Sequence, residues 1–275
     1  MYLIEKWLIK AKEILKTPYY TLCQFGIDLR LFFYACYRFP NYIVELIKFR
    51  RMYKGKLSLM PCLHDKYYEA GAVRNEYFWQ DLIVAQMIYK SNPTKHVDIG
   101  SRVDGFVAHV ASFREIEVFD IRPLNIKIPN VIFHQADIMN PESLPIVFDG
   151  YCDSLSCLHA LEHFGLGRYG DPIDPFGYIS ALKNMVRLLK PGGIFYLSVP
   201  IGQERVEYNA HRVFDPRTII KIAEELGLIL KKLIVINPNQ GPNEYPLENM
   251  SLNALANKKY NLGLFIFQKN EKLLS

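Results

Sequence analysis

Residues 96–106 read HVDIGSRVDGF, a short apolar strand that runs into a glycine-containing turn. Counting this strand, seven apolar segments have strand character, at 96–99, 116–119, 131–134, 154–157, 194–199, 228–236 and 262–268. Helical patterns lie before and between them, at 76–89, 105–113, 178–189 and 216–226. Strands that alternate with helices predict an α/β fold with a doubly wound, mostly parallel seven-stranded sheet. Ligands of such sheets bind outside the carboxyl ends of the strands.

The turn after the first strand discriminates between three kinds of nucleotide site. A phosphate-binding P-loop requires Lys and Ser or Thr after its second glycine, but Phe106 and Val107 stand there. A dinucleotide fingerprint requires a middle glycine, and Arg102 replaces it, which disfavours NAD and FAD. S-adenosylmethionine carries no phosphate, and its site is compatible with this turn.

Acidic residues stand at the ends of three successive predicted strands. Asp98 closes the first strand beside Gly100, Asp120 ends the second strand 22 residues later, and Asp137 follows the third. We expect Asp120 to accept from the ribose hydroxyls and Asp137 from the adenine amino group. Arg102 is a candidate partner for the methionine carboxylate, which suits a guanidinium. The predicted cofactor site also includes the neighbouring residues Ser101, Ile121, Ile138 and Cys157.

The chain at this point resembles the class I S-adenosylmethionine-dependent methyltransferases over roughly residues 76–270. The resemblance is carried by LEHF at 161–164, LKPGG and LSVP within 189–200, and HRVFDPRTI at 211–219. More narrowly, HVDIGSRVDGF together with LHALEHFGLGRYGDP at 158–172 resembles an uncharacterised methyltransferase-like family that accompanies surface-polysaccharide biosynthesis genes. This resemblance implies O-methylation of a sugar, a nucleotide-sugar or a glycan-linked phosphate.

The sequence departs from the methyltransferase pattern in two places. Arg102 and Asp104 stand near positions where further glycines are usual. Ten residues, 121–130, separate the second and third strands and include two prolines. A parallel crossover normally requires a dozen or more residues, so we expect a turn in place of a helix there.

His159, Glu162 and His163 are spaced i, i+3 and i+4, which places them on one face of a helix beginning near His159. Three interpretations remain open. Glu162 is interpreted first as structural, and His159 first as a base for an acceptor hydroxyl, with His163 as a further candidate. The trio is also competent to bind a divalent metal, which ranks last. Ubiquinone-pathway O-methyltransferases, which this region resembles, use a similarly spaced metal-binding trio with an acid at the position of His159.

The glycine-rich segment 165–177 follows this trio and is predicted to be a loop at the acceptor site. His211 is a third catalytic candidate, and Arg212 beside it suits a phosphate or carboxylate of the acceptor. A solvated pair is the alternative for both. Residues 238–246 are predicted to form a loop before the last strand.

Residues 1–56 differ from the rest of the chain because they hold 11 Lys and Arg against 4 Asp and Glu, with 13 of the 37 aromatic residues. We predict a basic helical extension over 1–60 and a methyltransferase-like domain over 61–275. Pro18, Gly26 and Pro40 are expected to divide the extension into three helices, the last at 42–51. An apolar face over residues 3–15 is compatible with a helix that packs on the domain or one that lies on a membrane surface. A dense basic stripe is lacking, which disfavours nucleic acid.

The composition, with 50% hydrophobic and 22% charged residues in 275, is that of a globular protein. The cysteine number, five, is odd and no C-x-x-C pair occurs, which favours a reducing compartment. No signal peptide and no apolar run of about 20 residues is apparent. We therefore expect a cytoplasmic protein, or one peripheral to the inner face of the membrane. A non-catalytic scaffold of this fold at a membrane is the alternative function, and a nicotinamide-dependent dehydrogenase is a weaker one.

Overall fold

The computed structural model describes residues 15–71, 73–143, 149–237 and 240–271. It divides into two compact units, Met1–Gly71 and Ala72–Ser275. The predicted apolar face over residues 3–15 lies almost wholly outside the described residues.

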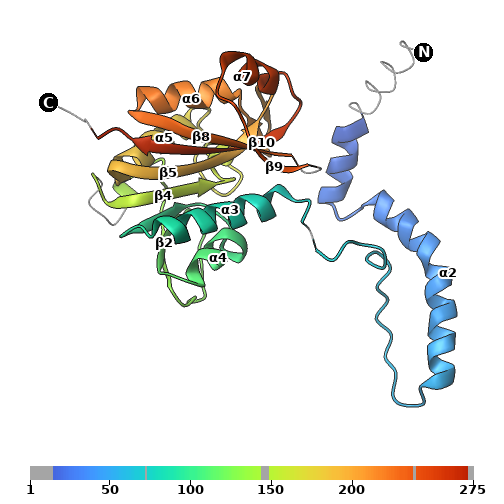
Figure 1. Ribbon diagram of the computed structural model, residues 1–275. Coiled ribbons are helices and arrows are strands. Elements are labelled where there is room, and N and C mark those ends of the chain that lie inside the picture. Colours follow the sequence, from blue (N-terminus) through green and yellow to red (C-terminus); the bar gives the residue numbers. More distant parts are fainter. Residues whose placement is uncertain (1–14, 72, 144–148, 238–239, 272–275) are drawn as a thin grey trace, which may run out of the picture. The chain divides into compact units, whose positions relative to one another are not determined.

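The C-terminal unit is built on an eight-stranded sheet with the order β3-β2-β1-β4-β5-β10-β8-β9 (Figure 1). Strands β1 to β5 pair in parallel, whereas β10 is antiparallel to both β5 and β8, and β9 is antiparallel to β8. The strands are β1 His96–Ile99, β2 Ile116–Asp120, β3 Val131–Gln135, β4 Cys152–Leu158, β5 Leu189–Ile201, β8 Leu228–Asn237, β9 Gly241–Glu244 and β10 Asn261–Lys269. The predicted mostly parallel sheet is confirmed, but it has one more strand than expected.

The additional strand, β9, lies in the segment that was predicted to be a loop. Its backbone pairs with β8 from Ile234 opposite Glu244 to Asn237 opposite Gly241. The sequence of β9, GPNE, carries turn residues and no apolar alternation, so only the pairing partner makes it a strand. A separate hairpin, β6 Arg205–Glu207 with β7 His211–Val213, follows β5.

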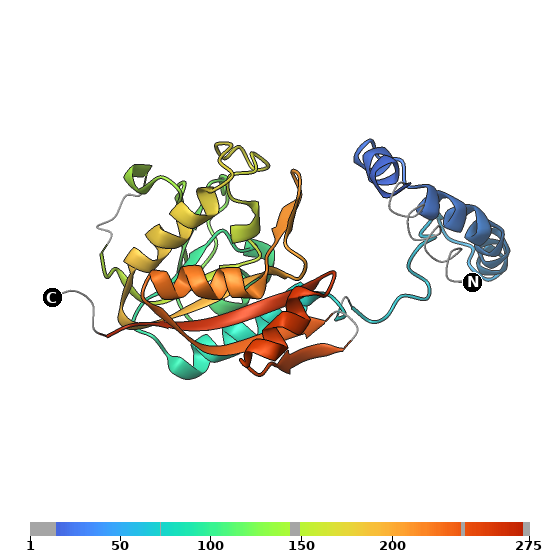
Figure 2. The same cartoon turned by 90° about the horizontal axis from the view of Figure 1, so that it is seen from above.

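Helices cover both faces of the sheet, as Figures 1 and 2 show. One apolar cluster joins α3 Glu76–Ser91 and α4 Ala108–Ala111 to one face. A second cluster joins α5 Gly177–Leu188, α6 Pro216–Glu225 and α7 Asn249–Ala256 to the other. Every residue of β1 and β2 is buried, as expected for central strands covered on both faces. The doubly wound α/β architecture is therefore confirmed.

Two connections shape the sheet edge at which the site lies. Residues 121–130 contain no helix, which confirms the turn predicted from the short crossover. The turn after β1 continues into a π-helical turn, Val103–Val107, before α4 begins. The predicted helix over 105–113 is therefore shorter and less regular than its sequence pattern indicates.

The N-terminal unit contains a helical segment at residues 15–24 and a long helix, α2 Leu29–Met52. The Asp28 side chain caps α2 by accepting from the backbone N–H groups of Arg30 and Leu31. Gly26, at φ 81°, makes the predicted break between the helices. The breaks predicted at Pro18 and Pro40 were wrong, because both prolines lie within helices. No helix among the described residues is long and apolar enough to cross a membrane.

Candidate functional site

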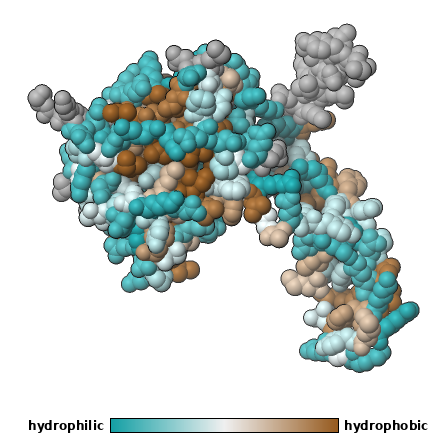
Figure 3. Space-filling model, viewed as in Figure 1, coloured by the Kyte–Doolittle hydropathy of each residue, from teal (hydrophilic) through white to brown (hydrophobic). Residues whose placement is uncertain are grey.

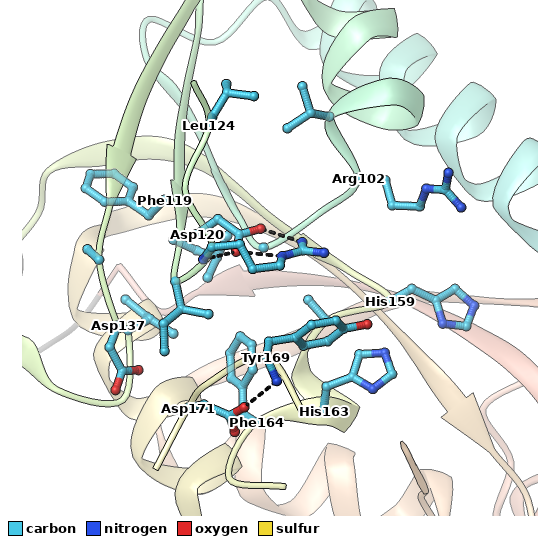
Figure 4. Close-up of a pocket in the computed structure, with 18 of the residues that line it drawn as sticks. Arg102, Phe119, Asp120, Leu124, Asp137, His159, His163, Phe164, Tyr169 and Asp171 are labelled. Atoms are coloured by element: carbon cyan, nitrogen blue, oxygen red, sulfur yellow. Dashed lines mark hydrogen bonds and ion pairs between the residues drawn. The ribbon is translucent and has the colours of Figure 1, made fainter. Parts of the chain in front are cut away.

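A cavity of about 520 Å³ opens at the carboxyl ends of β1, β2 and β4 and beside the segment after β3 (Figure 4). Two of its walls matter for function. The strand-tip wall comprises Gly100, Asp120 and Asp137 with the flanking Ile121 and Ile138. The histidine wall comprises His159 and His163, which line the cavity, and the carboxylates of Glu76 and Glu162 that pair with them.

Gly100 begins the turn after β1 with a left-handed backbone, at φ 70°. Its N–H donates to the Phe119 carbonyl oxygen at 2.8 Å, which ties the turn to β2. A Cβ at this position would stand 3.0 Å from the Ala160 Cβ, so a side chain here would crowd Ala160, the residue after His159. Gly100 itself therefore borders the cavity with backbone alone.

Asp98 does not line the cavity, although it lies at the tip of β1. Its carboxylate is fully buried and accepts from the Ser101 N–H at 3.0 Å, the Ser101 hydroxyl at 2.6 Å and the Ser156 hydroxyl. Burial raises the pKa of Asp98 to about 7, against the hydrogen bonds that lower it. Asp98 and Ser101 thus stabilise the turn by hydrogen bonds on its buried side, away from the cavity. Cys157 is also fully buried and away from the cavity lining.

Asp120 and Asp137 both border the cavity. Asp120 accepts from the backbone N–H of Arg122 at 2.8 Å, its Nε at 3.0 Å and its Nη2 at 2.5 Å. Asp137 accepts from the Met139 N–H at 2.9 Å, and partial burial raises its pKa. Arg122 was not among the predicted site residues, although its position two residues after a strand-tip aspartate is a signal for such a pair.

Arg102 borders the cavity, but its guanidinium pairs with Asp104, with Nε to Oδ1 at 3.0 Å and Nη2 to Oδ2 at 2.6 Å. It also lies over the Tyr77 ring, 5.7 Å from the centroid. The two residues that replace glycines in this turn therefore partner each other. Tyr77 comes from α3, the helix that precedes β1, and nothing in its local sequence marked it as a site residue.

The expected helix beginning at His159 is absent. Instead β4 ends at Leu158, His159 has a left-handed backbone at φ 51°, and a single 3₁₀ turn covers Leu161–His163. This backbone still gathers the side chains, because His159 Nδ1 lies 2.6 Å from Glu162 Oε1. His159 Nε2 lies 3.4 Å from Glu76 Oε1, and its ring stacks on Tyr77 with 4.5 Å between centroids.

The two carboxylates decide the charge of His159. Burial by itself lowers the pKa of this imidazole, but Glu162 and Glu76 raise it to about 9. Burial likewise acts to raise the pKa of Glu162, and the facing His159 lowers it. Glu76 is held in turn by the Tyr260 hydroxyl, which donates to it at 2.6 Å. His159 is therefore an imidazolium at neutral pH, a form that cannot accept a proton.

His163 has the opposite protonation state. Its Nδ1 lies 2.7 Å from the Ala210 carbonyl oxygen, an acceptor that fixes the proton on Nδ1 and leaves the Nε2 lone pair free. Burial lowers its pKa. Nε2 stands 3.8 Å from Glu162 Oε1, so a proton taken up there would be stabilised by that carboxylate.

Among the residues that the structure describes, no group of three His, Cys, Asp or Glu side chains is arranged to hold a metal ion. The short contact between His159 and Glu162 is that of a hydrogen-bonded ion pair. The metal interpretation of the His159, Glu162 and His163 trio therefore has no support in the geometry.

His211 lies outside the cavity lining, half-buried in β7 with its ring 6.2 Å from that of Tyr260. Arg212 is buried and donates to the carbonyl oxygens of Glu162, Phe164 and Pro175 at 3.3, 2.6 and 3.1 Å. Arg212 thus fastens the 3₁₀ turn and the glycine-rich loop, and the expectation that it faces an acceptor was wrong.

The glycine-rich loop is organised around Asp171, whose carboxylate accepts from the N–H groups of Gly165, Gly167 and Tyr169. This arrangement holds Tyr169 at the cavity, where its ring lies under the Arg122 guanidinium at 4.7 Å. In Figure 4, Tyr169 lies between Asp120 and His163. The glycine-rich loop is therefore ordered by its own hydrogen bonds and forms part of the cavity lining.

Comparisons with known proteins agree with this architecture. A family model described as "Caenorhabditis protein of unknown function, DUF268" matches residues 117–226, less than half of the chain. No curated protein matches the sequence.

Among solved structures, the chain is similar to the [4+2]-cyclase SpnF, with a TM-score of 0.50 and 13% identity over 70% of this chain and 82% of that one. It is also similar to the N-methyltransferase NodS from Bradyrhizobium japonicum WM9 in complex with S-adenosyl-L-homocysteine, with a TM-score of 0.47 and 16% identity over 71% and 88%. A third is the 1,6-didemethyltoxoflavin-N1-methyltransferase of Burkholderia thailandensis, with a TM-score of 0.47 and 13% identity over 78% and 93%. The similarity to SpnF, at 13% identity, shows the fold alone.

Proposed function

We propose that this chain is an S-adenosylmethionine-dependent methyltransferase, and that its acceptor is an oxygen of a sugar, a nucleotide-sugar or a glycan-linked phosphate. The observation that carries the proposal is the strand-tip wall. Asp120, the last residue of β2, and Asp137, two residues after the adjacent β3, border one cavity together with Gly100. The nature of the acceptor rests on the sequence resemblance alone.

The residues of this wall fit an adenosyl group. The cavity volume, about 520 Å³, is in the range of small-molecule sites. Ile121 and Ile138 supply apolar surface for adenine, and Asp137 supplies an acceptor for its amino group. Gly100 lines the cavity without a side chain, so a ligand can approach its backbone closely.

Asp120 would hold the ribose hydroxyls. A carboxylate offers about four lone-pair sites, and Arg122 donates to Asp120 in three hydrogen bonds. The ribose hydroxyls must therefore displace part of the Arg122 side chain. Arg122 can remain over the Tyr169 ring when it moves, because that contact does not involve Asp120.

The cofactor would supply an electrophilic methyl group on a sulfonium, so the protein is left to orient the acceptor and remove its proton. We assign the base to His163, because its Nε2 lone pair is free and the residue borders the cavity. His159, as an imidazolium between two carboxylates, would position Glu162. Glu162 would then stabilise the protonated His163.

Calorimetric titration of the full chain with S-adenosylmethionine and S-adenosylhomocysteine tests the proposal. Asp120→Ala is expected to weaken binding by at least about 1 kcal/mol, because charge-assisted hydrogen bonds are worth about 1.5–3 kcal/mol each. Asp149→Ala is the matched control, since Asp149 also pairs with an arginine, Arg187, but is exposed and away from the cavity. Equal affinity of the Asp120 variant and the wild type would refute the ribose assignment.

A non-catalytic scaffold is the second candidate function. The observation that favours it is the Arg122 side chain, which already occupies the carboxylate that a methyltransferase would offer to ribose. Absence of binding heat with either cofactor form, in a protein that folds normally, would select the scaffold.

A further inference from the structure

Within residues 15–71, the described part of the N-terminal unit, the apolar side chains do not form a buried core. Among these residues, only Arg38 is buried. Large apolar and aromatic side chains are exposed along both helices, and Figure 3 shows such side chains, in brown and tan, on the surface of this unit. Exposed apolar area of this extent on a soluble protein marks a surface that is covered by a partner or a membrane.

One face of α2 carries a continuous row of apolar side chains. Its residues recur at three- and four-residue spacing, which aligns them along the helix. Phe32 and Phe33 are 61% and 66% exposed, and Phe39 is 47% exposed. The face consists of Leu29, Phe32, Phe33, Cys36, Phe39, Ile43 and Ile47.

The polar side of α2 is the side that the rest of the unit covers. The ring of Tyr34 stacks on His64 at 6.2 Å, and the Arg38 guanidinium lies over the Tyr67 ring at 4.8 Å. Glu45 pairs with Lys66 on the same side. The segment that follows α2 therefore returns along this side and does not cover the apolar face.

A basic hollow lies at the C-terminal end of α2. Arg50, Arg51, Lys54 and Lys56 line it together with Leu57 and Leu59, and none of its lining residues is acidic. Arg50 is held in place by donating to the carbonyl oxygens of Tyr53 and Gly55 at 3.3 and 2.9 Å. Arg51, Lys54 and Lys56 have no carboxylate partner among the described residues. Cations beside apolar side chains suit a phosphate group at the boundary of an apolar medium.

We infer that the N-terminal unit docks on the surface of a membrane that contains anionic phospholipids. The apolar face of α2 lies in the interface, and the basic hollow binds the lipid phosphates. Charge complementarity selects this occupant, because residues 1–56 carry a net charge of +7 from 11 Lys and Arg against 4 Asp and Glu. A second copy of the chain would bring the same positive charge to the contact and would be repelled.

Co-sedimentation of the full chain with vesicles tests the inference. We expect binding to vesicles of phosphatidylcholine mixed with phosphatidylglycerol, weak binding to phosphatidylcholine alone, and release as the salt concentration rises. The hollow variant R50Q/R51Q/K54Q/K56Q is expected to bind at least about 10-fold more weakly, since each basic residue near an anionic surface contributes to the attraction. The control K183Q/K190Q/K221Q/K231Q removes as many exposed charges from the C-terminal unit and is expected to bind like the wild type.

The face variant F32S/F33S/F39S is also expected to lose at least about 10-fold in affinity, because the interfacial apolar area is removed. Circular dichroism checks that both variants keep the helix content of the wild type. Equal binding to both kinds of vesicle would overturn the role of anionic lipid. Absence of binding would overturn the inference as a whole. If the chain instead self-associates and the face variant is monomeric, a second copy covers α2. None of these outcomes depends on cofactor binding by the C-terminal unit.

Discussion

The strand-tip wall and the histidine wall of the cavity satisfy their carboxylates in different ways. Asp120 and Asp137 border the cavity and accept from nearby groups that a ligand is able to replace. Glu162 is fully buried, and its Oε1 is bound by His159 at 2.6 Å while its Oε2 has no hydrogen-bond partner. The first wall can exchange partners with a bound molecule. In the second wall, loss of either His159 or Glu162 would leave the other as a buried charge without a partner.

This contrast assigns separate tasks to the two walls. Ligand recognition belongs to the strand-tip wall, where the hydrogen bonds are replaceable. The histidine wall instead fixes protonation states, because a cationic His159 and a neutral His163 both face Oε1 of Glu162. Variants of the two walls should therefore fail in different assays, and the following changes test this in order of expected effect.

The largest effect is expected from Glu162→Gln, which removes one partner of the buried ion pair. Breaking such a pair typically costs about 3–5 kcal/mol, because the remaining charge is left without compensation. Urea unfolding at pH 6 should show this loss. The folded-state pKa of His159, about 9, lies above its ordinary value of 6.5, so its stabilisation is complete below about pH 6.5 and is lost as the pH rises through 9.

The deficit of the Glu162 variant should therefore shrink between pH 6 and pH 9.5. Glu224→Gln, at an exposed position of α6, is the control and should change stability by less than about 0.5 kcal/mol at either pH. A deficit that is independent of pH would show that His159 is not the charged partner.

The next prediction concerns the pKa values of His159 and His163, which should differ clearly. Nuclear magnetic resonance of the imidazole rings should give His159 a pKa of about 9, because Glu162 and Glu76 overcome the effect of its burial. His163 should titrate below its ordinary value of 6.5, because burial disfavours its charged form. Assignment by the single variants His159→Gln and His163→Gln identifies each signal. If the order of the two pKa values is reversed, the base is His159 and our assignment is wrong.

The sequence predicted the fold better than it predicted the site, and particular residues show why. Strand and helix patterns are local, and β1, predicted at 96–99, has the same bounds in the structure. The direction in which a strand-tip side chain points depends on its neighbours. Asp98 turns inward because Ser101 and Ser156 bind its carboxylate, and Ser156 belongs to a different strand.

The histidine wall could not be predicted from spacing for the same reason. The periodicity at 159–163 is helical, but the left-handed His159 and the 3₁₀ turn bring the same side chains together without a helix. Glu76 reaches His159 from a helix that precedes the whole sheet. Its contribution to the His159 pKa is visible only once the chain is folded.

The smallest effect is expected from Gly100→Ala. This change tests whether the close approach of Gly100 to Ala160, between the two walls, matters for stability and binding. A left-handed backbone costs a non-glycine residue about 1–2 kcal/mol. At Gly100 the new Cβ would also stand 3.0 Å from the Ala160 Cβ, next to His159. Gly150→Ala is a matched control, because Gly150 has nearly the same φ, 69°, and lies away from the cavity, where the added Cβ would meet only the Lys190 side chain at 3.7 Å.

Both variants should therefore lose about 1 kcal/mol of unfolding free energy from the backbone, as measured by urea denaturation. Only Gly100→Ala should lose more, and only this variant should also weaken cofactor binding in the calorimeter, because the pressure on Ala160 narrows the cavity between the walls. If the two alanine variants behave alike in both assays, the close approach of the turn to Ala160 has no consequence for binding. The two walls would then act independently, and the specificity of the strand-tip wall would have to come from its carboxylates alone.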